Sequence, residues 1–183
     1  MNGSKRYAVP AKYFKRLAPF AFLLGVVFSF PWVSIAAQPP RILALGDSLT
    51  AGYGLDTDDG FPSQLQRKLI AMGFAARVLN GGVSGDTSAG GLARLDWALA
   101  DRPSHAIIEL GANDGLRGLD PVAMRANLDA IIRRLQSANI AVLLTGMRAP
   151  PNLGRSYESA FNKVFPELAK KHNVVFYPFF LCG

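Results

Sequence analysis

The apolar positions of this chain fall into short continuous runs, separated by longer stretches with helical periodicity. Five runs have the length and composition of buried strands, namely residues 41–46, 76–80, 104–110, 140–145 and 173–177. Between the runs, apolar residues recur every three or four positions, which is typical of helices that bury one face. Five strands alternating with four such helices predict an α/β fold, a doubly wound parallel sheet with helices on both faces.

The four predicted helices differ in how clearly the sequence marks their ends. The clearest begins at Pro121 after the capping residue Asp120, and its apolar stripe is Met124, Leu128, Ile131, Ile132 and Leu135. Another begins at Pro62 and ends at Gly73, and a third contains the leucine stripe of residues 92–99. The last helix contains Pro166, which predicts a kink or a break because proline removes a backbone hydrogen bond.

The first 36 residues have the pattern of an export signal. The five basic residues at the amino end all precede Leu17 without an acidic residue among them, and residues 17–35 then contain no charge. A basic segment, an apolar segment and the small residues Ser34 and Ala36 predict a signal peptide at residues 1–36, with cleavage after Ala36. We therefore expect a periplasmic or secreted protein, in which residues 37–40 are a linker and residues 41–183 form the folded domain.

An uncleaved membrane anchor is the alternative for the same segment. Its 19 uncharged residues are just long enough to span a bilayer. Pro19 and Pro31 shorten the continuous helix, and the small residues fit a cleavage site, so the signal peptide is favoured. Contact with a membrane is expected only through this leader, if the leader is retained.

The formal net charge of +7 comes mainly from the leader. From Ala37 onward the chain has 15 basic and 13 acidic residues, an excess of only +2, so we expect no nucleic acid partner. The single cysteine, Cys182, excludes a disulfide within the chain, and two histidines are too few for a zinc site of the usual Cys/His spacing. Cys182 is expected to be a free, partly buried thiol.

Three glycine-rich loops follow the first three predicted strands, with the sequences GDSLTAGYG (46–54), GGVSGDTS (81–88) and GANDG (111–115). The carboxyl ends of parallel strands lie at one edge of a sheet, so the loops are expected to form one site. Ser48 lies at a sharp strand-to-helix turn that can present its hydroxyl as a nucleophile. The backbone N–H groups of Ser48 and Gly85, with the Asn113 side-chain amide, can converge on an oxyanion.

The blocks GDSLTAGYG, NGGVSGDTS and ELGANDGLRG resemble those of the GDSL, or SGNH, hydrolases, and their order and spacing are similar to the periplasmic thioesterase/lysophospholipase/arylesterase branch. The resemblance extends from about residue 41 to about residue 180. It implies a flavodoxin-like three-layer α/β/α sandwich, with Ser48 as the nucleophile and with Gly85 and Asn113 completing the oxyanion hole. The implied substrates are small acyl esters or thioesters, and no metal or organic cofactor is implied.

The sequence departs from this family at the catalytic base. The family's base is a histidine in an Asp-x-x-His block after the fifth strand, and no Asp-x-x-His occurs in this sequence. His105 begins the third predicted strand and His172 ends the last helix, so both are expected to be structural. We therefore expect a truncated domain that lacks the last loop and helix, leaves one flank of the sheet uncovered and hydrolyses esters poorly. The alternative is a catalytically inactive protein that binds acyl chains or is vestigial.

The substrate itself is not indicated by the sequence. Candidates for the lining of an acyl groove are Tyr53, Phe61, Met147, Phe179 and Phe180. Aromatic and methionine residues near strand ends are more often part of the core, so these five residues do not distinguish one ester or thioester from another.

Overall fold

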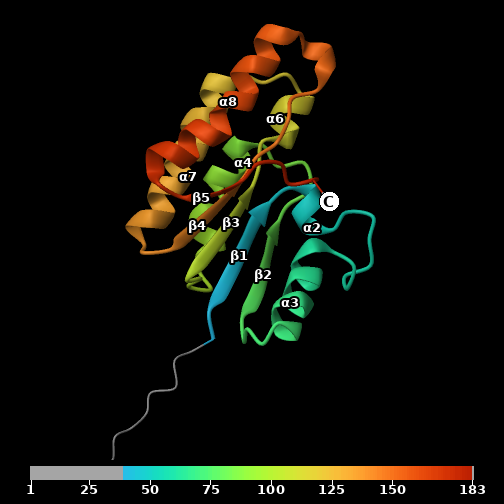
Figure 1. Ribbon diagram of the computed structural model, residues 1–183, viewed down its shortest axis with the longest axis vertical. Coiled ribbons are helices and arrows are strands. Elements are labelled where there is room, and N and C mark those ends of the chain that lie inside the picture. Colours follow the sequence, from blue (N-terminus) through green and yellow to red (C-terminus); the bar gives the residue numbers. More distant parts are fainter. Residues whose placement is uncertain (1–38, 183) are drawn as a thin grey trace, which may run out of the picture. The chain divides into compact units, whose positions relative to one another are not determined.

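The computed structural model describes residues 39–182, so the predicted signal peptide lies outside the described residues. Five parallel strands form one sheet in the order β2-β1-β3-β4-β5, with helices on both of its faces (Figure 1). The strands are β1 (Arg41–Gly46), β2 (Arg77–Gly82), β3 (His105–Glu109), β4 (Ala141–Thr145) and β5 (Val175–Tyr177). The predicted α/β class and its five-stranded parallel sheet are confirmed.

The four predicted helices are present with two differences, and two further short helices, α2 and α6, follow β1 and β3. They are α2 (Ser48–Ala51), α3 (Phe61–Ala71), α4 (Ser88–Ala93), α5 (Leu95–Ala98), α6 (Ala112–Leu116), α7 (Pro121–Ser137) and α8 (Arg155–His172), with a 3-10 turn η2 (Pro151–Leu153) before α8. Helix α7 is capped as predicted, because the Asp120 carboxylate accepts a hydrogen bond from the Val122 N–H at 2.9 Å. The leucine stripe of residues 92–99 forms two short helices in place of one. None of the helices within residues 39–182 is both long and apolar enough to cross a membrane.

Helix α8 runs through Pro166 as one helix of 18 residues, so of the predicted kink or break, the break is wrong. The proline costs the helix about 3 kcal/mol. Four apolar side chains on both sides of it, Phe161, Val164, Phe165 and Leu168, are no more than 2% exposed. Each contributes about 1.5–3 kcal/mol when fully buried, so their packing outweighs the cost of the proline.

One face of the sheet carries the main hydrophobic core. Helices α7 and α8 cover this face, and α4 packs against α7. The largest contributions come from side chains that are no more than 2% exposed: Leu43, Leu45, Ile108 and Leu144 from the strands and Leu128, Ile131, Leu135, Phe161 and Phe165 from the helices. This packing fixes β1, β3 and β4, and with them the loops at their carboxyl ends.

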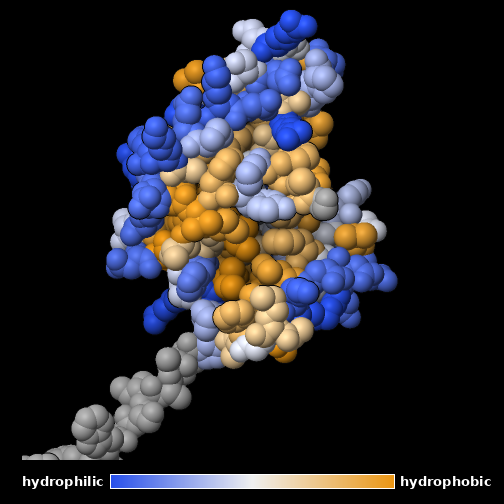
Figure 2. All heavy atoms as spheres, viewed as in Figure 1, coloured by the Kyte–Doolittle hydropathy of each residue, from blue (hydrophilic) through white to orange (hydrophobic). Residues whose placement is uncertain are grey.

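The other face of the sheet is only partly covered, by α2, which packs against β1 and β2, and by α3, which packs against β2. An apolar hollow of about 310 Å³ lies between α3 and the strands, lined by Ile42, Leu65, Leu69, Ile107, Leu143 and Val175 among others. Figure 2 shows the apolar side chains gathered over the strands, with polar residues around them. Val175 is 68% exposed there, so apolar surface reaches solvent on this face.

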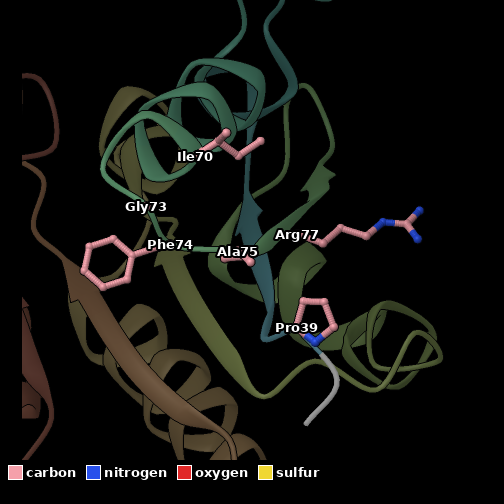
Figure 3. Close-up of a pocket in the computed structure, with 7 residues that line it drawn as sticks. Pro39, Ile70, Gly73, Phe74, Ala75 and Arg77 are labelled. Atoms are coloured by element: carbon pink, nitrogen blue, oxygen red, sulfur yellow. The ribbon is translucent and has the colours of Figure 1, made fainter. Parts of the chain in front are cut away.

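A second apolar hollow, of about 410 Å³, lies where α3 leads into β2 (Figure 3). Ile70 and Phe74 line it together with Pro39, which precedes β1. Because the strands are parallel, this hollow lies at their amino ends, and the glycine-rich loops lie at the opposite edge of the sheet.

Candidate active site

The three glycine-rich loops meet at the carboxyl ends of β1, β2 and β3. Since β1 lies between β2 and β3, the sheet order alone makes the three loops neighbours. Ser48 is the first residue of α2, immediately after the turn at Asp47. Asp47 caps this short helix, because its Oδ1 accepts a hydrogen bond from the Leu49 N–H at 3.0 Å. The turn therefore fixes the position of Ser48.

Asn113 joins the three loops through its side-chain amide. Its Nδ2 donates to the Asp47 carboxylate at 3.0 Å and to the backbone carbonyl of Asp86 at 2.9 Å. The structure therefore places Asn113 beside the turn of Ser48 and beside the loop of Gly85. Both amide hydrogens of Asn113 have protein acceptors, so one of these two hydrogen bonds has to break before the amide can donate to a ligand.

Gly85 has a positive φ of 87°, a conformation that glycine adopts readily. Its carbonyl accepts a hydrogen bond from the Arg117 guanidinium at 2.8 Å. Within residues 39–182, the backbone N–H groups of Gly85 and Ser48 donate to no protein acceptor. Two of the three predicted oxyanion donors therefore have no acceptor within the described residues.

A cavity of about 290 Å³ opens beside Ser48 and Asn113. Its apolar lining comes from several segments: Leu49, Leu116, Met147, Pro150, Phe179 and Leu181. The Arg148 guanidinium lies over the Phe179 ring, 4.8 Å from its centroid. An uncharged chain attached to a group at Ser48 would contact mainly apolar side chains here. Gly85 is not among the lining residues.

The predicted groove residues divide into two groups. Met147 and Phe179 line the cavity beside Ser48, as the sequence suggested. Tyr53 is 79% exposed. Phe61 and Phe180 pack edge to face with ring centroids 5.0 Å apart and line a different hollow on the open face of the sheet.

Glu109 is a buried acid beneath the site that sequence reasoning missed. It ends β3 and is 0% exposed. Its Oε2 accepts hydrogen bonds from the Thr50 hydroxyl at 2.7 Å and from the Asp47 N–H at 3.2 Å. The available signal was an acidic residue at the end of an otherwise apolar strand, which is unusual because buried acids need partners.

Two further buried or half-buried networks support the loops, and sequence reasoning did not identify them either. Arg94 pairs with Asp86 at 2.5 Å and donates from Nη2 to the carbonyl of Gly46 at 2.9 Å. Asp114 accepts hydrogen bonds from the backbone N–H and the hydroxyl of Ser88, at 2.8 and 2.6 Å. Both networks join the second loop to its neighbours.

The two acids beneath Ser48 share a low-dielectric environment. Burial, and then the charge of Asp47, raises the pKa of Glu109 to about 8, against an opposing hydrogen bond from Thr50. Burial also raises the pKa of Asp47, but hydrogen bonds from Leu49 and Asn113 oppose this by favouring the charged form. The proton shared by this pair therefore resides on Glu109 near neutral pH.

Neither histidine lies at the site. His105 is the first residue of β3, at the amino edge of the sheet, and its Nδ1 is 2.9 Å from the Ser104 hydroxyl. His172 ends α8, and its Nε2 is 2.6 Å from Asp129. Among the side chains of residues 39–182, none makes a hydrogen bond to the Ser48 hydroxyl.

The remaining titratable groups add little to the site. Cys182 is free and exposed, so the expectation of a partly buried thiol is wrong; it follows the last turn, where no element covers it. In the described part of the chain, no three His, Cys, Asp or Glu side chains come close enough together to hold a metal ion.

Comparisons with known proteins agree with this architecture. The sequence pattern of the GDSL-like Lipase/Acylhydrolase family matches residues 44–182. The chain is 41% identical to the esterase TesA of Pseudomonas aeruginosa over 164 residues, which are 89% of this chain and 82% of that protein. It is 40% identical to thioesterase 1/protease 1/lysophospholipase L1 of Escherichia coli, over 89% of this chain and 74% of that protein. The crystal structure of AlinE4, an SGNH-hydrolase family esterase, superposes with a TM-score of 0.76 and 50% identity, over 79% of this chain and 78% of that one.

Proposed function

This chain belongs to the GDSL-like lipase/acylhydrolase family and is an ester-hydrolysing serine hydrolase, and we propose that Ser48 is its nucleophile. The observation that carries this proposal is the Asn113 amide, which ties the loops of Asp47 and Asp86 together beside Ser48 at the mouth of an apolar cavity. The substrates we propose are acyl esters or thioesters, with the acyl chain in that cavity. The names of the esterase and thioesterase relatives support this class of substrate.

The proposed reaction uses the three loops together. The Ser48 hydroxyl oxygen loses its proton to solvent and forms a bond to the acyl carbon, whose carbonyl oxygen becomes an oxyanion. The backbone N–H groups of Ser48 and Gly85 are available to this oxyanion, and the Asn113 amide becomes available when it leaves Asp47 or the carbonyl of Asp86. The carbonyl then re-forms as the bond to the leaving oxygen or sulfur breaks, and the leaving atom takes a proton from solvent. Water afterwards hydrolyses the acyl ester of Ser48, which releases the carboxylic acid and restores the hydroxyl.

Within the described residues, this reaction lacks a protein group that can accept the proton of the Ser48 hydroxyl. Attack requires a base, and no histidine or carboxylate of residues 39–182 is hydrogen-bonded to the Ser48 hydroxyl. Loss of a member of a catalytic triad reduces turnover by several orders of magnitude. We therefore propose that this chain hydrolyses esters only slowly.

Hydrolysis of p-nitrophenyl butyrate tests both parts of the proposal. We expect turnover barely above the uncatalysed rate, and slow labelling by a fluorophosphonate that peptide mapping places on Ser48. Ser48→Ala should abolish both, whereas Ser84→Ala, an exposed serine of the neighbouring loop, should change neither. Fast turnover that depends on Ser48 would contradict the slow reaction, and labelling that survives Ser48→Ala would contradict the nucleophile.

A second candidate function is binding of acyl chains without turnover. It is favoured by the same cavity of about 290 Å³, whose apolar lining needs no base to bind a chain. Binding of a fluorescent fatty acid separates the two functions. If only binding occurs, Leu116→Asp should weaken it while Ser48→Ala should not, and no covalent label should form.

We also propose that the protein is exported, with residues 1–36 removed. The basic and apolar segments of the leader support this proposal. Amino-terminal sequencing of the protein recovered from outside the cytoplasm should begin at Ala37. A chain that begins at Met1 and stays with the membrane would support the anchor instead.

A further inference from the structure

Glu109 lies directly under the turn that carries Ser48, although it contacts no open part of the cavity. Its side chain is 0% exposed, and one carboxyl oxygen, Oε1, has no hydrogen-bond partner within residues 39–182. A buried carboxylate with one unpartnered oxygen and no paired cation is costly, because the two hydrogen bonds to the other oxygen compensate only part of the charge. A buried neutral carboxylic acid costs less, so burial without a paired cation favours the protonated form.

The other oxygen of Glu109 holds the turn on both sides of Ser48. It accepts from the N–H of Asp47, the residue before Ser48, and from the hydroxyl of Thr50, two residues after it. The turn packs tightly against the Glu109 side chain. A Cβ atom at Gly46, the last residue of β1, would overlap both Thr50 and Glu109. Movement of Glu109 therefore has to move the residues that flank Ser48.

The charged groups on the turn above Glu109, or joined to that turn by hydrogen bonds, come from three segments. Asp47, from the turn after β1, brings a carboxylate that accepts hydrogen bonds of its own. Arg94, from the junction of α4 and α5, is bonded to the carbonyl of Gly46, and Asp86 pairs with it. Arg94 donates from Nε to Asp86 and from Nη2 to Gly46, while its buried Nη1 has no partner, and no cation is paired with Glu109 in the described part of the chain.

We propose that Glu109 is a positioning residue, which in its neutral, protonated form holds the nucleophile turn, and that loss of its proton releases this turn. Ionisation would place a second negative charge beside Asp47 in a fully buried position, where no cation of residues 39–182 is paired with Glu109. The turn would then have to open to hydrate the charge, and the N–H of Asp47 and the hydroxyl of Thr50 would move with it. The role of Glu109 in holding the turn does not depend on the proposed function. Only an effect of Glu109 on ester hydrolysis rests on the proposal that Ser48 is the nucleophile.

Carbon-13 NMR of the full chain tests the protonation directly. The sequence has three glutamates, and Glu158 and Glu167 are exposed on α8 and serve as internal references. With carboxyl-labelled glutamate, we expect the Glu109 resonance to titrate near pH 8. Thr50→Val removes a hydrogen bond that favours the charged form and should move that midpoint to higher pH. A Glu109 resonance that is already ionised at pH 6 would overturn the proposal.

Proton–nitrogen NMR tests the effect on the turn. We expect the backbone amides of Asp47 and Ser48 to shift with the midpoint of the Glu109 resonance. Glu109→Gln keeps an acceptor oxygen and cannot ionise, so this transition should disappear, while Glu158→Gln, the same change at an exposed site, should retain it. If the two amides do not follow the Glu109 carboxyl in the wild-type chain, Glu109 does not position the turn.

The two proposals fail in different ways. Ser48→Ala removes the proposed nucleophile but leaves the bonds of Glu109 intact, so the amide and carboxyl titrations should persist in that variant. Absence of Ser48 labelling would therefore leave the positioning role standing. If neither the wild-type chain nor Ser48→Ala shows the titration, the positioning role of Glu109 is refuted, and the proposal that Ser48 is the nucleophile is not affected.

Discussion

The buried proton of Glu109 should make the free energy of unfolding depend on pH between about 4.5 and 8. The usual pKa of this carboxyl is 4.5, and burial raises it to about 8 in the folded chain. Below pH 4.5 both states carry the proton and the full stability is present. As the pH rises toward 8, the unfolded chain loses the proton while the folded chain keeps it, so stability is lost over this window.

The magnitude follows from the same two values. Each pH unit within the window lowers the free energy of unfolding by at most about 1.4 kcal/mol for one proton. Between pH 5 and pH 8 the loss is about 3.5 kcal/mol, and the complete loss is about 5 kcal/mol. Because Glu109 is 0% exposed, solvent does not screen this effect. A typical domain has 5–15 kcal/mol of stability, so the change is large enough to measure.

Urea denaturation followed by circular dichroism, at pH 5, 6, 7 and 8, measures this dependence. Glu109→Gln cannot ionise, so relative to wild type it should gain about 3.5 kcal/mol between pH 5 and pH 8. Glu158→Gln is the matched control and should follow the wild-type curve. If the Glu109→Gln and wild-type curves stay parallel across the four pH values, Glu109 does not hold a proton in the folded chain.

Three other predictions concern stability and association. Phe161→Ala should lower the free energy of unfolding by about 3–5 kcal/mol in urea denaturation, because Phe161 is 0% exposed in the core. Asp129→Asn should lower the free energy of unfolding by about 1 kcal/mol at pH 7, because a hydrogen bond from Lys171 lowers the pKa of the Asp129 carboxyl and stabilises its charged form. This loss should become smaller as the pH falls through that pKa, and urea denaturation at pH 7 and pH 3 measures the difference. Val175→Lys on the open sheet face should reduce self-association in analytical ultracentrifugation, whereas Val122→Lys, at an equally exposed site on α7, should not; equal association of both variants would contradict this.

Much of the fold could be predicted because its signals are local. Strand β1 begins and ends where the apolar run of residues 41–46 does, and α7 begins at the predicted Pro121. The loops of Ser48 and Asn113 follow the carboxyl ends of strands, and parallel pairing then brings them to one edge. Periodicity, caps and glycines specify such features within a few residues of sequence.

The parts that could not be predicted depend on contacts between distant residues. Glu109 and Thr50 are 59 residues apart, and Asn113 and Asp47 are 66 residues apart, so no local pattern indicates these hydrogen bonds. The continuity of α8 through Pro166 depends in the same way on side chains that pack against other elements. Tertiary packing decided both outcomes, and local preference did not.

The open sheet face and the proposed site belong to different parts of the same sheet. Val175 and Glu109 lie on one face, because Ile107, Leu143 and Val175 are paired in register and Glu109 is two residues beyond Ile107. Val175 is at the amino end of β5, an edge strand, whereas Glu109 is at the carboxyl end of β3 in the centre. Within residues 39–182, the side chains that hold the turn of Ser48 by hydrogen bonds are Glu109 at the carboxyl end of β3, Asn113 in α6 and Asp47 in the turn itself. Solvent or a second molecule on the open face should therefore change solubility and association without changing the turn, and Val175→Lys should leave the Glu109 titration as it is in the wild-type chain.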